Sequence, residues 1–474
     1  MPDKSNQKSL TLLGFFAITA TMVMTVYGYP TFATSGFHLA FFLIFGGFLW
    51  FIPVALCAAE MATTEGWEEG GIFTWTASSL GNMWGFAHIF FQWFEITVGF
   101  TPMLYFIVGA LSYVFNWPAM NTDPTIKFAT MIIIFWALTF SQFGGTKYTA
   151  LISKIGFFVG ILIPAIILLL LGLYYVMSGN PVHVTVNAAS FVPDFANANT
   201  LVVFVSFILG FMGVESSAVH VHEMKNPNRD YPLAMLILVV LAIVLNTLGG
   251  LTIAAAVPVD QLNLSSGVVQ TYSVIFALFT TATWPVRVLG FMIAVGVIAE
   301  VSAWVVGPSH GVHIAAKQGL LPKAFSKVNK NGIPVNLVLV QALVVSFWFA
   351  VLTFGSGGSG NMSFLTSMSL TVVIYLVGYL LFFIAYLNKI YHHAELKSSY
   401  NIPGGKVCKT IVAVVGFIVS IGALIISFVP PASLTGSQPQ EYVTILLVAW
   451  VVVISIPFII YGVYGRHHIK INNK

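Results

Sequence analysis

Glycine and glutamate residues interrupt a long apolar stretch of this chain. The stretch starts at Phe204 with the pattern of a membrane-spanning helix. Gly210, Gly213 and Glu215 interrupt that pattern, and two serines follow Glu215. A carboxylate inside a membrane span costs about 2.5–3.5 kcal/mol, and glycine weakens a helix by about 1 kcal/mol relative to alanine. A segment that is both charged and weakened is a poor membrane anchor. We therefore expect it to hold a polar ligand at mid-membrane.

Four of the fifteen acidic residues fall well within apolar runs: Glu60, Glu95, Glu215 and Glu300. Leaving all four charged and unpaired would cost on the order of 10 kcal/mol, comparable with the stability of a whole domain. Each carboxyl group either satisfies backbone groups at a helix break or interface, or takes part in binding. The structural role is favoured for Glu60 and the binding role for Glu215, while both stay open for Glu95.

Glu300 and Trp304 are four residues apart and share one face of a predicted helix. A carboxylate beside an indole suits a zwitterion, whose ammonium group needs an acceptor and an aromatic face. The alternative is an interface tryptophan with a polar neighbour. Arg287 precedes Glu300 by thirteen residues, about 20 Å along a helix, so it is expected near the outer mouth.

Two further places carry tyrosines that could contact a ligand. Thr371, Tyr375 and Tyr379 recur every four residues, a polar stripe that either lines a cavity or packs against a neighbour. Tyr27 adjoins Gly28 in an interrupted apolar run, where a phenol can close over a bound substrate.

Glu215 and Glu300 are also candidates for proton binding, together with three histidines near span ends: His220, His222 and His310. Histidine titrates near pH 6.5, so these side chains can sense acid. Single interface histidines are more often structural, and that alternative stays open.

Composition places the chain in a membrane. Of its 474 residues 58% are hydrophobic and only 7% charged, against about 25% charged in soluble domains. We expect about twelve transmembrane helices, because apolar runs long enough to span recur along the chain. They lie near 10–34, 38–63, 84–115, 126–143, 151–177, 199–219, 231–257, 284–315, 335–354, 362–388, 409–429 and 442–464.

The basic residues predict the orientation. With both termini cytoplasmic, 17 of the 19 Lys and Arg side chains lie inside, leaving Lys127 and Arg287. This bias obeys the positive-inside rule. The first apolar run lacks a cleavage motif, so no signal peptide is expected. A multi-pass protein of the bacterial cytoplasmic (inner) membrane is predicted, with no basic patch for nucleic acid.

Two interrupted runs stand five spans apart. The run 10–34 breaks near Tyr27, and the run 199–219 breaks at Gly210–Ser217. Such pairs are typical of inverted-repeat transporters and mark their binding sites. We expect one transmembrane domain, 1–474, with a first repeat of about 10–177, a second of about 199–388 and two extra helices at about 409–464.

Motifs of other classes are missing from the sequence. It has no Walker A motif, HExxH, CxxC or nucleophile elbow, so neither ATP coupling nor an enzyme is expected. Cys57 and Cys408 are not expected to meet, and no metal or other cofactor is predicted. Secondary transport is the class of function that these absences leave.

Several segments resemble the amino acid–polyamine–organocation superfamily, and within it the bacterial glutamate/γ-aminobutyrate antiporters of acid resistance. They are Leu10–Ala20, Tyr29–Gly36, Ala58–Thr63, Gly66–Gly71, Gln142–Tyr148, Gly213–Ser216, Lys225–Pro232 and Asn401–Lys406. Together they extend over essentially the whole chain.

The resemblance implies an all-α, LeuT-type fold of five plus five helices, with discontinuous helices 1 and 6 and two added C-terminal helices. It implies alternating-access exchange of external glutamate for internal γ-aminobutyrate, coupled to a cytoplasmic glutamate decarboxylase that consumes a proton. By position, five residues match the family's substrate pathway: Tyr27, Glu215, Glu300, Trp304 and Tyr379. Backbone at Val23, Met24 and Thr25 is expected to hold the substrate carboxylate.

The chain departs from that family in three places. Relatives can carry an acidic residue at Gly28 and an arginine at His310, and both positions can tune the response to pH. Relatives also have a longer polar C-terminal tail that closes the inner mouth. Here Lys474 comes about ten residues after the last predicted span, so either the chain is truncated or another element gates it.

Two alternatives remain open at this point. A zwitterion site of this composition would also suit an exchanger of another amino acid and its decarboxylation product. A sodium-coupled amino acid symporter would need an ion site near the first break, for which Ser302 is the only hydroxyl offered by the run 284–315 near Glu300.

Overall fold

The computed structural model describes residues 11–24, 26–67, 71–144, 146–196, 203–355, 360–431, 434 and 436–465. Within helices, only the backbone is described for 146–150, 218–220, 222–223, 228 and 306. This described part of the chain is helical and has no β-strand. The prediction of an all-α protein is therefore confirmed.

Eleven helical segments in the described part are long and apolar enough to cross a membrane. They correspond to eleven of the twelve predicted spans. The twelfth, 199–219, starts in residues outside the described ranges and continues as a short apolar helical stretch, Phe204–Ser217. The break predicted at Gly210–Ser217 explains why this helical stretch is short.

The α-helices of the spans, in chain order, are α1 (Leu12–Val23), α2 (Tyr29–Ala33), α3 (His38–Gly46), α4 (Ile52–Ala62), α6 (Asn82–Val114), α8 (Pro124–Gln142), α9 (Thr146–Ile155), α10 (Ile163–Met177), α13 (Phe204–Leu209), α14 (Pro227–Ala256), α16 (Trp284–Lys317), α17 (Val335–Phe354), α18 (Gly360–His392), α19 (Gly405–Ile426) and α20 (Gln438–Ile460). Short α-helices connect them: α5 (Gly71–Leu80), α7 (Ala119–Thr122), α11 (Ala188–Phe191) and α15 (Gly267–Phe276). Wider π-helical turns link α3 to α4, link α9 to α10 and follow α20; they are η3 (Gly47–Phe51), η4 (Gly156–Leu162) and η8 (Tyr461–Gly465).

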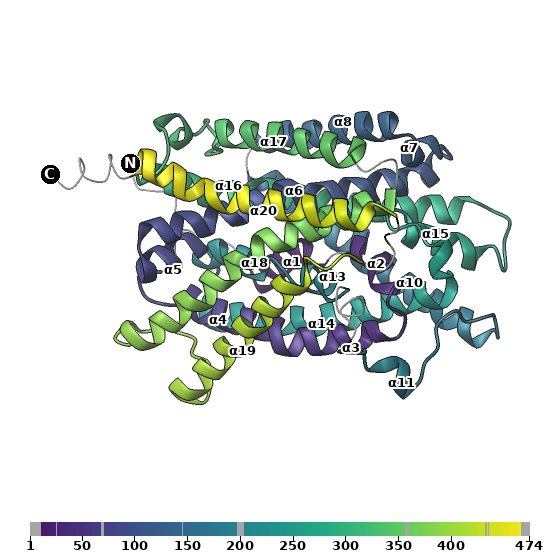
Figure 1. The fold of residues 1–474 in the computed structure, drawn as a ribbon, viewed down its shortest axis with the longest axis horizontal. Coiled ribbons are helices and arrows are strands. Elements are labelled where there is room, and N and C mark those ends of the chain that lie inside the picture. Colours follow the sequence, from purple (N-terminus) through teal and green to yellow (C-terminus); the bar gives the residue numbers. More distant parts are fainter. Residues whose placement is uncertain are drawn as a thin grey trace.

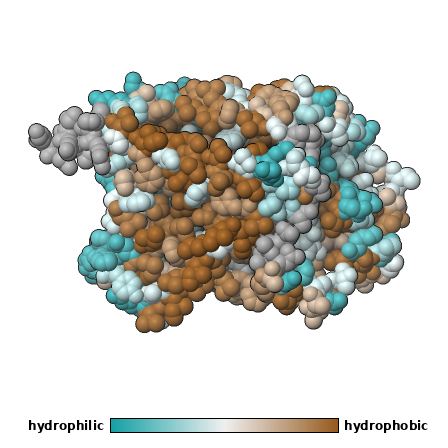
Figure 2. Space-filling view, viewed as in Figure 1, coloured by the Kyte–Doolittle hydropathy of each residue, from teal (hydrophilic) through white to brown (hydrophobic). Residues whose placement is uncertain are grey.

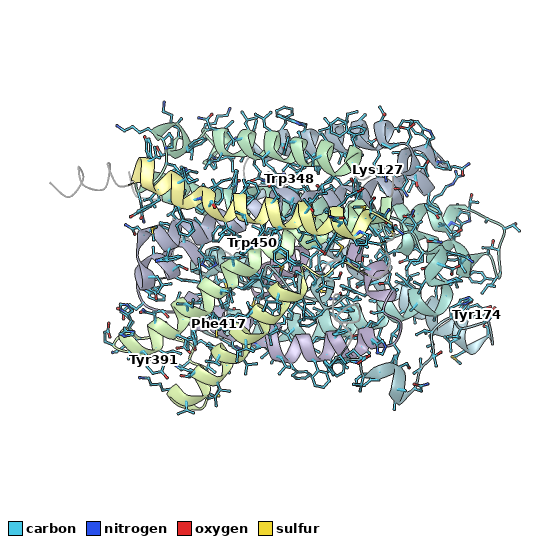
Figure 3. All side chains as sticks on the ribbon, in the orientation of Figure 1. Lys127, Tyr174, Trp348, Tyr391, Phe417 and Trp450 are labelled. Atoms are coloured by element: carbon cyan, nitrogen blue, oxygen red, sulfur yellow. The ribbon has the colours of Figure 1, made fainter. Side chains whose placement is uncertain are left out.

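The long helices run side by side, and the short helices α7, α11 and α15 gather at one end of the bundle (Figure 1). Hydrophobic side chains form a broad band around the middle, with hydrophilic ones concentrated toward the two ends (Figure 2). Lys127 and Tyr174 lie at one end of this band and Tyr391 lies at the other (Figure 3). This pattern is what a membrane-spanning bundle requires, because its lipid-facing middle must be apolar.

The three longest helices, α6, α16 and α18, form the centre of the bundle, where α6 packs along both of the others. Small residues let helices approach closely in a membrane. Gly99 of α6 faces the side chain of Thr371 on α18, and Gly160 of η4 lies directly against the backbone of Gly296 on α16. Thr371 therefore packs between helices rather than lining an open cavity.

The contact between Gly160 and Gly296 has no room for a methyl group, since a Cβ on either residue would meet the other's backbone. Gly160→Ala should therefore lower the unfolding temperature in detergent, because overpacking a close contact costs about 1–3 kcal/mol. Gly422→Ala in α19 is the matched control, since a Cβ there meets nothing within 4 Å. An equal effect of the two variants, measured by fluorescence-detected size exclusion after heating, would contradict this packing.

Candidate functional site

The first break interrupts the segment that starts the bundle. Helix α1 ends at Val23, and Met24 caps it by donating its N–H to the Ala20 carbonyl oxygen at 2.8 Å. A single 3₁₀ turn, Val26–Gly28 (η2), then leads into α2. Val23 and Met24 are fully buried, while Thr25 lies outside the described residues.

The second break follows α13. Gly213 has a φ of +101°, a left-handed conformation that favours glycine, and a 3₁₀ segment, Val214–Glu223 (η5), starts after it. A Cβ on Gly213 would lie 2.6 Å from the Cζ2 atom of Trp304. Glycine is thus required here both for its backbone angle and for the approach of an indole ring.

Trp304 joins the two breaks. From α16 its Nε1–H donates to the carbonyl oxygen of Met22, one residue before the end of α1, at 3.1 Å. The edge of the same ring lies against Gly213. The indole is buried, so it holds the ends of both interrupted segments together.

Glu215 lies at the centre of a hydrogen-bond network. Its Oε1 accepts from the Tyr375 hydroxyl at 2.5 Å, and its Oε2 accepts from the Tyr379 hydroxyl at 2.8 Å. The Tyr379 oxygen in turn accepts the N–H of Gly213 at 3.2 Å. Hydrogen bonds to a charged acceptor are about twice as strong as neutral ones. The second break is therefore fastened to α18 through this carboxylate.

Gln92 of α6 completes this network and was not among the predicted site residues. Its Nε2 donates to the Ser216 hydroxyl at 2.5 Å and the Tyr375 hydroxyl at 2.7 Å, and lies 3.4 Å from Glu215 Oε1. A signal was present: an amide in an apolar run, three residues before Glu95, shares a helix face with that acid.

Glu300 is in the opposite situation. It is fully buried, and neither of its carboxyl oxygens has a hydrogen-bond partner among the residues described. Tyr27 is close enough to interact electrostatically with Glu300 and Glu95, and Glu95 in turn with Glu215. The structure thus gathers three acids and Tyr27 around the helix breaks. A ligand with a positively charged group would neutralise the negative charge of the Glu300 carboxylate.

The histidines predicted to sense acid are only partly described by the structure. His310 is exposed on α16, with its ring 6.2 Å from that of His313. The His313 Nδ1 contacts the Phe325 carbonyl oxygen at 3.1 Å. The side chains of His220 and His222 fall outside the described residues.

Glu60 forms a separate charged cluster near the end of the bundle where Tyr391 lies (Figure 3). Its Oε1 pairs with Lys389 at 3.0 Å and Lys409 at 2.7 Å. Its Oε2 accepts from the Tyr386 hydroxyl and the Ile402 N–H. These bonds join α4 to α18 and to the segment before and within α19. Glu60 is therefore paired with two lysines, whereas the structural role favoured for it was that of a neutral acid bonded to backbone groups.

Comparison with known proteins gives a consistent result. Residues 10–454 match the amino acid permease family. The chain is 58% identical over 462 residues to each of two proteins named glutamate/gamma-aminobutyrate antiporter, from Lactococcus lactis subsp. lactis and subsp. cremoris, covering 97% of this chain and 92% of theirs. It is also 24% identical over 396 residues, 82% of each chain, to a probable agmatine/putrescine antiporter of Lactococcus lactis.

The contact of Trp304 with Gly213 leads to a double-mutant test. Gly213→Ala should lower the unfolding temperature, because the new methyl group meets the ring and the left-handed backbone costs an L-residue about 1–2 kcal/mol. Trp304→Phe should relieve part of that loss by shortening the ring. Unfolding temperatures of the two single variants and the double variant measure the coupling, and strictly additive effects would refute the contact.

Proposed function

The chain belongs to the amino acid permease family, and we propose that it exchanges external glutamate for internal γ-aminobutyrate by alternating access. The observation that carries this proposal is the buried Glu300 carboxyl group beside two broken helices, which has no hydrogen-bond partner in the described part of the chain. Both substrates carry an ammonium group and at least one carboxylate. The names of the Lactococcus relatives support the substrate pair.

Each end of the substrate has a group suited to it. The ammonium group lies toward Glu300, with the Trp304 ring as its aromatic face. The substrate carboxylate lies against the backbone where α1 ends, at Val23 and Met24 and, as the resemblance implies, at Thr25, and Tyr27 covers the site. Glu215 and Tyr379 lie beside this pathway and hold the second break.

We assign the response of transport to acid mainly to the carboxyl groups of Glu215 and Glu300. Glu215 accepts hydrogen bonds from four side chains, which offset part of the cost of burying its charge. Glu300 has no such donors among the described residues, so a proton or an ammonium ion must neutralise it. His220, His222 and His310 remain further candidates for pH sensing. Decarboxylation of imported glutamate by a cytoplasmic decarboxylase would consume a proton in each cycle, which contributes to acid resistance.

The orientation follows from charge. Tyr391 lies at the end of the bundle opposite Lys127 (Figure 3). Lys389 precedes Tyr391 by two residues on α18, the Lys406 Nζ lies over the Tyr391 ring, and Lys409 pairs with Glu60 beside Lys389. The positive-inside rule makes the lysine-rich end cytoplasmic, with both termini inside a bacterial inner membrane. The end with α7 and α15 then faces outward.

The sodium-coupled alternative rests on the Ser302 hydroxyl. Its oxygen accepts from the Gln142 amide at 2.8 Å and keeps a second lone pair, so a transport measurement decides this alternative. An exchanger for another amino acid and its decarboxylation product remains the second candidate, because a carboxylate beside an indole suits any zwitterion with an ammonium group.

Proteoliposomes separate these functions. Uptake of labelled glutamate should require γ-aminobutyrate inside, increase as the external pH falls and be unchanged when sodium is replaced by potassium. Uptake into empty vesicles, or dependence on sodium, would refute antiport. Stronger exchange with another internal amine would favour the second candidate.

Two substitutions test the site itself. Glu300→Gln and Trp304→Ala should each lower exchange about tenfold or more, because a hydrogen bond to a charged group contributes about 1.5–3 kcal/mol and 1.4 kcal/mol is a factor of ten. Glu441→Gln and Trp348→Phe are the matched controls, since they lie on α20 and α17 outside the site. Equal exchange in test and control variants, at matched reconstituted amounts, would refute this assignment.

A further inference from the structure

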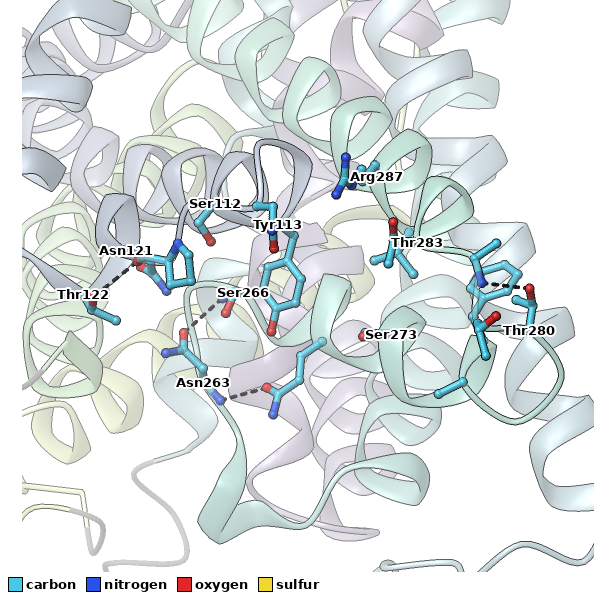
Figure 4. A pocket seen from close by; sticks show the side chains of 18 residues that line it. Ser112, Tyr113, Asn121, Thr122, Asn263, Ser266, Ser273, Thr280, Thr283 and Arg287 are labelled. Carbon is cyan, nitrogen blue, oxygen red and sulfur yellow. Dashed lines mark hydrogen bonds between the residues drawn. The ribbon is translucent and has the colours of Figure 1, made fainter.

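A cavity of about 630 Å³ lies at the end of the bundle that faces outward in the proposed orientation. Its walls come from the end of α6, from α7, from α15 and from the first turn of α16 (Figure 4). Twelve of its eighteen lining side chains are neutral and polar, one is charged and none is acidic. The cavity is separate from the residues around the helix breaks.

Arg287 is the charged residue of this cavity. It is exposed in the first turn of α16, where the helix dipole disfavours a cation. Among the described residues it forms no ion pair. Lys127, the other basic residue at this end, is buried over the Tyr105 ring. Arg287 is thus the exposed guanidinium at this end, and its planar fork matches a carboxylate.

Neutral donors and acceptors surround that fork. The Ser273, Thr281 and Thr283 hydroxyl groups line the cavity and make no hydrogen bond with the described part of the protein. Asn116 adds an amide group that can donate or accept, whereas the Gln270 amide is already bonded to Asn263 and Gln261. This wall suits a ligand with a carboxylate and an ammonium group, and lacks the acids that would attract a simple cation.

The cavity is aligned with the central site. Arg287 precedes Glu300 by thirteen residues on the same helix, about 20 Å along its axis. Helix α6 likewise reaches both places, since it carries Gln92 in the network and Tyr113 in the cavity wall. A ligand in the cavity therefore contacts the two helices that also carry central-site residues.

We propose that this cavity is an outer capture site that binds the carboxylate of external glutamate through Arg287 before the amino acid enters the central site. The proposal rests on the exchange function and on the orientation proposed above. Such a site raises the local concentration of an anionic substrate, as charged clefts do.

A cysteine introduced at Thr281 tests binding without requiring transport. In intact cells, an impermeant sulfonate methanethiosulfonate should label Thr281→Cys faster than the trimethylammonium reagent does. External glutamate should slow both reactions. Adding Arg287→Gln should lower the anionic-to-cationic rate ratio about tenfold and remove the protection by glutamate, while Arg287→Lys should retain part of both effects.

Val186→Cys is the control, because Val186 is 63% exposed and lies in the 178–198 connection, outside the cavity lining. Its labelling should respond neither to glutamate nor to Arg287→Gln. Native Cys57 is buried, and Cys408 belongs to the opposite end. Labelling of Val186→Cys but not Thr281→Cys or Thr283→Cys would show that the cavity is closed to the outside and overturn the proposal.

Two further outcomes would also overturn it. Equal protection by sulfate would indicate an inorganic anion site, and no protection by glutamate would leave no capture site. In proteoliposomes, Arg287→Gln should raise the KM for external glutamate about three- to tenfold with an unchanged maximal rate. Because the labelling needs no exchange, failure of wild-type exchange together with intact protection would refute the transport proposal alone.

Discussion

Breaking a helix inside a membrane frees backbone groups that lipid cannot hydrogen-bond. In this protein two side chains from intact helices satisfy such groups. The Trp304 indole donates to the Met22 carbonyl oxygen, and the Tyr379 hydroxyl accepts the Gly213 N–H. Without them each break would leave a polar group unsatisfied, at a cost of about 1–3 kcal/mol. The site can exist because α16 and α18 supply these partners.

The same arrangement gives the carboxyl groups of Glu215 and Glu300 different hydrogen-bonding surroundings. Glu215 is surrounded by donors from α6, α18 and its own segment. Glu300, on the unbroken α16, faces the breaks without any donor in the described structure. One acid thus stabilises the architecture while the other is left for a proton or an ammonium group. Glu60, paired with two lysines, joins helices at the end of the bundle.

Local patterns predicted much of this arrangement. The glycines placed the second break, and the four-residue spacing placed Glu300 and Trp304 on one face of α16. The partners of Glu215 and Glu60 were less accessible. Tyr375 was recognised only as part of a stripe, and Gln92 was overlooked, because it meets Ser216 from 124 residues away. Lys389 and Lys409 contact Glu60 across 329 and 349 residues.

The sequence by itself determined the membrane class, eleven of the twelve predicted spans, the position of the second break and the family, since these follow from composition, from periodicity and from motifs along the chain. Only the tertiary structure decided that Glu215 accepts several hydrogen bonds while Glu300 accepts none from the described residues. The donors come from helices that are distant in sequence. It also decided that Trp304 spans both breaks and that polar residues from four helices surround Arg287. Such convergence depends on how helices pack, which a linear pattern does not record.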